Sequence, residues 1–334
     1  MPSLYARSKD LGFSLVLGGL VGLVGAGVAV AFLKALSFAN EARVDNGWLI
    51  YLLPVAGLVI GLTYHHFGNH VSRGSNLVLE EIHEPGAGVP RRMAPMVFAA
   101  TFVSHLFGAS TGREGAGIQI TSSIVDGVAR MFSPSLETRR LLLITAIAAA
   151  FGGLFGVPIA GVVFALEFQE SGRIRYEAIL SALTAALVAF YAVESFNLEH
   201  LTENTLGPID INASLVWKLV VLAAVSAALA MSFVKATHFV HKTAARFITW
   251  PPLRPVVGAL LVLALVVTGA LLAPAIAITR TWFDGPIYFH QLVVGGLLFG
   301  LFYSAGCSLL TRLLNPKNPV KPGAEQDVAT VAMA

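Results

Sequence analysis

Long apolar stretches alternate with short polar connections along most of this 334-residue chain. A helix needs about 17 to 25 apolar residues to cross a bilayer. Eight stretches predict such helices: Leu11–Leu36, Trp48–Tyr64, Ala94–Phe107, Leu141–Phe168, Ala178–Val193, Leu215–Val234, Val256–Ile276 and Gln291–Leu310. Several are short or glycine-rich, and a broken helix is tolerated in a membrane only where protein or a water-filled cavity covers its free backbone ends. The pattern predicts an all-α polytopic membrane protein whose interruptions mark a site.

The composition of the chain predicts that it lies in a lipid bilayer and does not bind nucleic acid. Hydrophobic residues make up 56% of the chain and charged residues 12%, against about 25% charged in a soluble domain. The formal net charge of +3 is modest, so we expect no nucleic-acid partner. The single cysteine, Cys307, excludes an internal disulfide framework and a clustered-thiolate metal site. We therefore expect no cofactor.

The distribution of charge predicts how the chain is oriented. The loop with Glu194, Glu199, Glu203 and Asp210 has no lysine or arginine, whereas the next connection contains Lys242, Arg246 and Arg254. Because basic loops stay in the cytoplasm, the acidic loop is expected outside. Residues 1–10 lack the pattern of a signal peptide and are predicted to be a cytoplasmic amino terminus. Residues 11–311 then form the membrane domain, in the cytoplasmic membrane, and residues 312–334 a disordered cytoplasmic tail.

A glycine loop, Gly112–Arg113–Glu114–Gly115, precedes a mostly apolar stretch and is the first candidate site. Glycines let backbone amides approach a ligand, and the first turn of a helix has unpaired N–H groups at the positive end of its dipole. We expect a half-helix whose amino end binds an anion. Glu114 would compete with that anion and leave once protonated, as a proton-coupled gate. Arg113 should pair with a carboxylate or carbonyl, or reach the interface.

A second glycine break, Gly74–Ser75–Asn76, precedes the apolar residues Leu77 and Val78. It predicts another half-helix end directed at the same anion, with Ser75 and Asn76 as neutral donors. Either glycine motif alone is weak, because such features in membrane proteins more often serve packing.

Three motifs in order resemble the CLC family of anion transporters. They are Gly74–Ser75–Asn76, Gly112–Arg113–Glu114–Gly115, and the glycine-rich stretch from Ala148 through Pro158 to Glu167. The connecting sequences Glu81–Ile82–His83, Arg91–Arg92–Met93–Ala94–Pro95 and Ser104–His105–Leu106–Phe107–Gly108 resemble the fluoride/proton antiporter branch of that family. Two departures from the chloride members agree with this branch: Ala116 replaces a proline, and Phe168 replaces an internal proton-handling glutamate.

The resemblance implies a homodimeric transporter, not an enzyme, that exports fluoride against protons. It implies that Glu114 is the external gating and proton-transfer carboxylate, and that Ser75 or Asn76 contacts the anion from the inner side. Fluoride is strongly hydrated, so compact neutral donors must replace its water. The resemblance covers about residues 11–268, and no Gly-x-Phe-x-Pro loop follows Val256. We therefore expect a CLC-like first inverted repeat plus an incomplete second repeat with broken half-helices.

Other functions remain open. The same fold could move chloride, as a channel or a chloride/proton antiporter, and a chain with an incomplete second repeat could be a truncated, non-transporting membrane protein. Histidines at positions His65, His66, His70 and His83 could bind a metal, although loop histidines are more often solvated, and we predict no metal site.

Two further groups of residues have simpler interpretations. Ser104, His105 and Ser110 would suggest a serine hydrolase, but no Gly-x-Ser-x-Gly elbow accompanies them. The small residues of the long glycine-rich stretch are expected to share one helix and to let neighbouring helices approach closely. They are Gly152, Gly153, Gly156 and Ala160.

Overall fold

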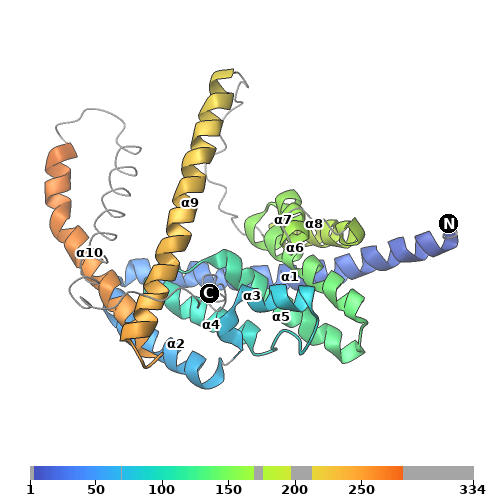
Figure 1. Cartoon of the computed structure of the whole chain (residues 1–334), viewed down its shortest axis with the longest axis horizontal. Coiled ribbons are helices and arrows are strands. Elements are labelled where there is room, and N and C mark those ends of the chain that lie inside the picture. Colours follow the sequence, from blue (N-terminus) through green and yellow to red (C-terminus); the bar gives the residue numbers. More distant parts are fainter. Residues whose placement is uncertain (1–3, 69, 169–175, 197–212, 281–334) are drawn as a thin grey trace, which may run out of the picture. The chain divides into compact units, whose positions relative to one another are not determined.

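The computed structural model describes residues 4–68, 70–168, 176–196 and 213–280, and every regular element within these ranges is a helix. The α-helices are α1 (Leu4–Asp45), α2 (Leu53–Phe67), α3 (Ser75–His83), α4 (Met93–Leu106), α5 (Arg113–Ala129), α6 (Leu136–Phe155), α7 (Pro158–Glu167), α8 (Ile179–Glu194), α9 (Ala213–Phe247) and α10 (Leu253–Arg280). Short 3-10 helices are η1 (Gly47–Leu52), η2 (Val71–Arg73), η3 (Arg130–Phe132) and η4 (Tyr176–Ala178). The prediction of an all-helical fold is confirmed (Figure 1).

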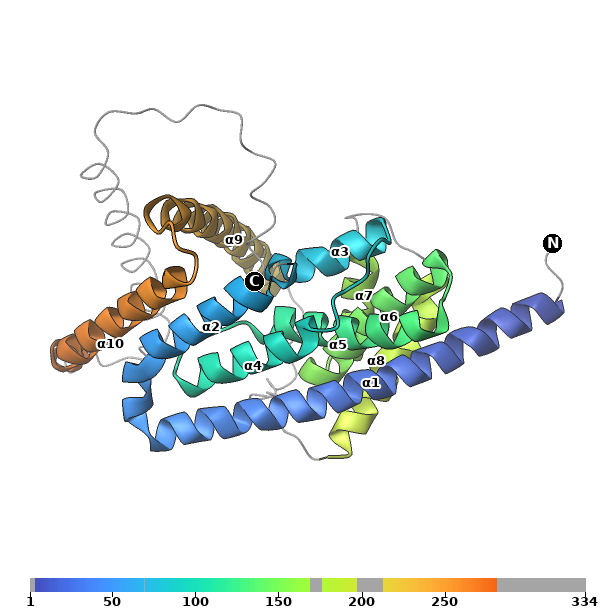
Figure 2. The same ribbon diagram turned by 90° about the horizontal axis from the view of Figure 1, so that it is seen from below.

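The chain forms two compact units, and the candidate site lies in the first. This unit comprises α1 to α8 together with residues 248–259, and the second comprises α9 and the remainder of α10. Helix α6 lies at the centre of the first unit, where it packs against α1, α5, α7 and α8. The long helix α1 also packs along α4 and α5 (Figure 2). Ile144 and Ile147 of α6 are fully buried in the core that results.

Small residues set the close spacing of α1, α6 and α8. A Cβ atom added to Gly152 of α6 would lie 2.3 Å from the carbonyl oxygen of Ala186 on α8, and one added to Gly22 of α1 would lie 2.7 Å from that of Ala185. Gly153 similarly faces Ala29 of α1. Glycine at these points lets helix backbones touch. The predicted packing role is therefore confirmed for Gly152 and Gly153.

The predicted single span Leu141–Phe168 is wrong, because it divides into α6 and α7. Helix α6 ends at Phe155, and the next residue, Gly156, has a left-handed φ of 67° and terminates the helix instead of serving as a packing position. Pro158 then begins α7, as expected of proline in a first turn. Ala160 therefore lies on a different helix from Gly152, and its side chain is exposed.

A side-chain cap marks the amino end of α6. The Oγ atom of Ser135 accepts a hydrogen bond from the backbone N–H of Thr138 at 3.2 Å, and Glu137 lies in the first turn, where a carboxylate favours the helix dipole. This cap fixes where α6 starts, three residues before the buried Arg139.

The helices have the lengths and exposed apolar surfaces of a multi-pass integral membrane protein. In the part of the chain that the structure describes, four helical segments are long and apolar enough to cross a bilayer: Leu11–Asp45, Gly47–Phe67, Leu136–Phe155 and Leu215–Phe247. The last is longer than the predicted span Leu215–Val234. The predicted span Gln291–Leu310, the tail 312–334 and most of the acidic loop lie outside the described residues.

Candidate functional site: two uncapped half-helices

Helix α5 begins where the first candidate motif predicts a helix start. Gly112 is the N-cap residue, in an extended conformation, and no side chain caps the helix. Its first-turn N–H groups therefore stay available to a ligand. Glu114 lies in this turn and is exposed, with its Oε2 atom 3.4 Å from where a Cβ of Gly112 would be. The carboxylate thus folds back over the amino end of the helix.

The other residues of this motif have supporting positions. Arg113 is the first residue of α5 and is half-buried, as is Gly115. Within the described part of the chain, Arg113 forms no ion pair with a carboxylate. Of the three predicted surroundings of Arg113, a carboxylate, a carbonyl or the membrane interface, the carboxylate is therefore not found among these residues.

Helix α3 begins at the second candidate motif. Gly74 is its N-cap residue, with φ 59° and ψ −139°, a conformation essentially restricted to glycine. Ser75 is the first helical residue and only 3% exposed, while Asn76 is half-buried. No side chain caps this helix either. The structure therefore has two half-helix starts with uncapped amino ends, as predicted.

A hydrogen bond between side chains joins the two half-helices. The Nε2 atom of Gln119 on α5 donates to the Oγ atom of Ser75 on α3 at 3.3 Å, and both residues are buried. Gln119 lies five residues after Glu114, which is about 7.5 Å along the helix axis. The structure thus brings Ser75 next to Gln119, a residue for which no role was predicted.

We predict a measurable coupling between Ser75 and Gln119. Unfolding of the variants Ser75→Ala, Gln119→Leu and the double variant, followed by circular dichroism in mixed micelles, gives a double-mutant cycle. The coupling free energy should be about 0.5–1.5 kcal/mol, the net contribution of a buried neutral hydrogen bond. A coupling of zero would mean that the two side chains are independent in solution.

A buried charge cluster ties the carboxyl ends of the same half-helices together. The Nη2 atom of Arg139 on α6 lies 2.7 Å from Oε2 of Glu81 on α3, and its Nε atom lies 2.7 Å from Oδ1 of Asp126 on α5. All three residues are nearly fully buried: Arg139 is 5% exposed, Glu81 6% and Asp126 1%. Charged residues within a membrane protein are expected to pair in this way.

The two carboxylates also hold the loop between α3 and α4. Glu81 accepts hydrogen bonds from the backbone N–H groups of Gly86 and Gly88, at 3.0 and 2.8 Å. Asp126 accepts one from Val89 at 2.8 Å. No role was predicted for this cluster. The sequence signal that could have found it is a charged residue, such as Arg139, at the end of an apolar segment, because a charge there needs a partner.

Two alternative sites are not assembled. Among the described residues, no group of three or more histidine, cysteine, aspartate or glutamate side chains could hold a metal ion, and the Nδ1 atom of His83 lies 2.9 Å from the carbonyl oxygen of Leu79. The ring of His105 contacts Asn40 and the carbonyl oxygen of Thr111, not a serine hydroxyl. The histidine metal site and the hydrolase arrangement are therefore not supported by these residues.

Broken helices with uncapped amino ends inside an all-helical membrane fold define a class of proteins that handle ions within the bilayer. The chain belongs to the CLC family: the family model described as voltage gated chloride channel matches residues 56–313.

Named relatives agree with this assignment. A chloride/fluoride channel protein of Pseudomonas syringae pv. tomato is 39% identical over 251 residues, which cover 74% of this chain and 55% of the relative. An H(+)/Cl(-) exchange transporter, ClcA, of Salmonella arizonae is 29% identical over 202 residues, or 55% of this chain and 41% of the relative. The chain thus spans about half the length of these curated relatives.

Solved structures show the same fold. The crystal structure of a CLC-type fluoride/proton antiporter matches with a TM-score of 0.72 and 28% identity, covering 92% of this chain and 78% of that one. A slow cyanobacterial Cl−/H+ antiporter matches with a TM-score of 0.61 and 18% identity, covering 75% of this chain and 62% of that one. The second likeness concerns the fold alone.

Proposed function

We propose that this chain exports fluoride in exchange for protons, with Glu114 as the gating and proton-transfer carboxylate. The observation that carries the proposal is the pair of uncapped half-helix starts, at Ser75 and at Gly112 to Glu114, joined through Gln119. The amino ends of α3 and α5 offer helix dipoles to an anion, and α5 also offers first-turn N–H groups, without a full positive charge that would trap the anion.

The chemistry of these donors suits fluoride. A small, strongly hydrated anion needs compact hydrogen-bond donors in place of its water. The backbone amides of Ser75 and of Gly112 to Gly115, with the buried hydroxyl of Ser75, provide such donors. The exposed carboxylate of Glu114 folds over the same helix end, so it is placed to compete with the anion until it binds a proton.

Fluoride is named in the descriptions of two similar proteins, the Pseudomonas syringae relative and the fluoride/proton antiporter structure. Chloride transport is the second candidate, because ClcA of Salmonella arizonae is described as an H(+)/Cl(-) exchange transporter. We further propose that the protein works as a homodimer in the cytoplasmic membrane, with both ends of the chain in the cytoplasm, as the charge pattern predicts.

The test is anion efflux from liposomes that contain the purified chain, loaded with either fluoride or chloride at equal concentration. Efflux of fluoride at least about tenfold faster than efflux of chloride, equal to about 1.4 kcal/mol of selectivity, is the expected result, with empty liposomes as the control. Faster chloride efflux would favour the chloride alternative. Reconstituted protein that passes neither ion would support a non-transporting membrane protein.

A further inference from the structure

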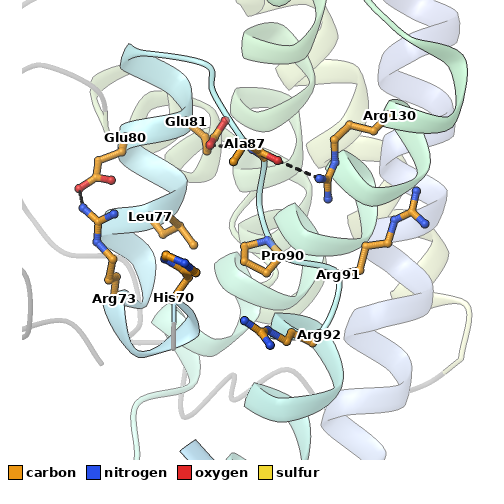
Figure 3. A pocket seen from close by; sticks show the side chains of 11 residues that line it. His70, Arg73, Leu77, Glu80, Glu81, Ala87, Pro90, Arg91, Arg92 and Arg130 are labelled. Carbon is orange, nitrogen blue, oxygen red and sulfur yellow. Dashed lines mark hydrogen bonds and ion pairs between the residues drawn. The ribbon is translucent and has the colours of Figure 1, made fainter. Parts of the chain in front are cut away.

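A cationic cavity lies along α3, from Arg73 near the amino end of that helix to Glu81 near its carboxyl end. Its volume is about 670 Å³. The residues that line it come from η2 and its N-cap, from α3, from the α3–α4 loop and from the start of η3 (Figure 3): His70, Arg73, Leu77, Glu80, Glu81, Ala87, Gly88, Pro90, Arg91, Arg92 and Arg130. Four arginines thus face two glutamates. The positive side chains outnumber the negative ones around a space far larger than a halide ion.

The carboxylates of the lining already have partners. Glu80 pairs with Arg73, and Glu81 pairs with Arg139, which lies outside the lining. Arg130 bonds to the carbonyl oxygens of Ala87 and Val89, at 3.0 and 2.6 Å. These contacts neutralise Glu80 and Glu81 and fix one wall of the cavity.

Two guanidinium groups of the lining, those of Arg91 and Arg92, have no carboxylate partner among the described residues. Arg91 donates to the carbonyl oxygen of Gly127 at 3.0 Å, and Arg92 donates no hydrogen bond to any residue that the structure describes. Both are exposed. In Figure 3 the guanidinium of Arg92 projects into the opening beneath Pro90, toward the ring of His70. The cavity therefore has the guanidinium group of Arg92 directed into it, with no hydrogen-bond acceptor among the residues that the structure describes.

The arginines near the cavity indicate which side of the membrane it faces. The carboxyl ends of α3 and α5 lie beside Arg139 and Arg140 at the start of α6. Arginine accumulates in this way on the cytoplasmic side of a membrane. Basic pockets on the cytoplasmic side of a membrane protein suit the phosphate groups of anionic lipids. The wall of this cavity also contains apolar residues such as Leu77 and Pro90.

We propose that this cavity binds a phosphate group at the cytoplasmic surface of the membrane, with Arg92 as the principal ligand. The planar guanidinium fork matches a phosphate with two parallel hydrogen bonds. The volume accommodates a phosphate with its substituents. The phosphate is that of an anionic lipid headgroup or of a soluble phosphate compound.

Native mass spectrometry of the full chain in detergent tests this site. The apparent dissociation constant for phosphatidylglycerol is measured against zwitterionic phosphatidylcholine, and inorganic pyrophosphate is titrated in a second arm. Loss of one charge-assisted hydrogen-bonding partner should weaken binding by about tenfold or more in Arg92→Gln. Arg92→Lys keeps the positive charge and loses the planar guanidinium group. Its dissociation constant should lie between those of Arg92→Gln and the wild type.

Arg246→Gln is the matched control, because Arg246 is an exposed arginine of α9 outside the cavity, and it should change the dissociation constant by less than about twofold. Binding of phosphatidylglycerol alone would identify a lipid headgroup. Binding of pyrophosphate with the same dependence on Arg92 would identify a soluble phosphate compound. No preference of the wild type for either over phosphatidylcholine, or equal losses in Arg92→Gln and Arg246→Gln, would overturn the proposal.

Discussion

Replacing Arg139 with methionine should destabilise the protein by about 3–5 kcal/mol, the usual effect of removing one partner from a buried ion pair. The change would leave the carboxylates of Glu81 and Asp126 buried without their shared cation. Because these residues hold α3 and α5 and the loop between α3 and α4, the loss should affect the whole first unit. The free energy of unfolding in mixed micelles, followed by circular dichroism, measures it.

The neighbouring residue provides a matched control. Arg140 is half-buried, donates to the carbonyl oxygen of His83 at 2.7 Å and lies 3.7 Å from Glu137. Arg140→Met should therefore lower stability by only about 0–1 kcal/mol. Adding Glu81→Gln and Asp126→Asn to Arg139→Met should recover part of the loss, since no buried charge then lacks a partner. If Arg139→Met and Arg140→Met lowered stability equally, the buried charge cluster would not be what holds α3, α5 and the connecting loop together.

Glu114→Gln should abolish the dependence of fluoride efflux on external pH. In the wild type the carboxylate must bind a proton to leave the anion position, so flux should rise as external pH falls. One proton limits this rise to about tenfold per pH unit. An amide cannot be deprotonated, so flux through Glu114→Gln should change by less than about twofold per pH unit. The measurement is fluoride efflux from proteoliposomes over a series of external pH values.

Glu194→Gln is the control for surface charge, because Glu194 is an exposed carboxylate at the end of α8 and is predicted to face the same side of the membrane. It should keep the wild-type pH dependence. A flat pH profile in the wild type, or a Glu114→Gln profile as steep as that of the wild type, would exclude Glu114 as a proton-controlled gate.

Local sequence patterns determined the class of the protein and where its half-helices begin. Apolar length and low charge predicted an all-helical membrane fold. Glycine and proline act through their own backbone preferences, so Gly74 and Gly112 marked helix starts without knowledge of the rest of the fold. The break at Gly156 and Pro158 had the same local signal, but the apolar stretch on both sides was interpreted as one span.

Only the tertiary structure decided which polar side chains meet. Arg139 lies 58 residues from Glu81 and contacts it through the packing of α3 against α6. Gln119 lies 44 residues from Ser75. Hydrophobic periodicity specifies that a helix packs, but not which neighbour it meets or in which register, because apolar contacts are non-directional. The buried charge cluster, the hydrogen bond between the half-helices and the cationic cavity therefore follow from the packing arrangement of the first unit.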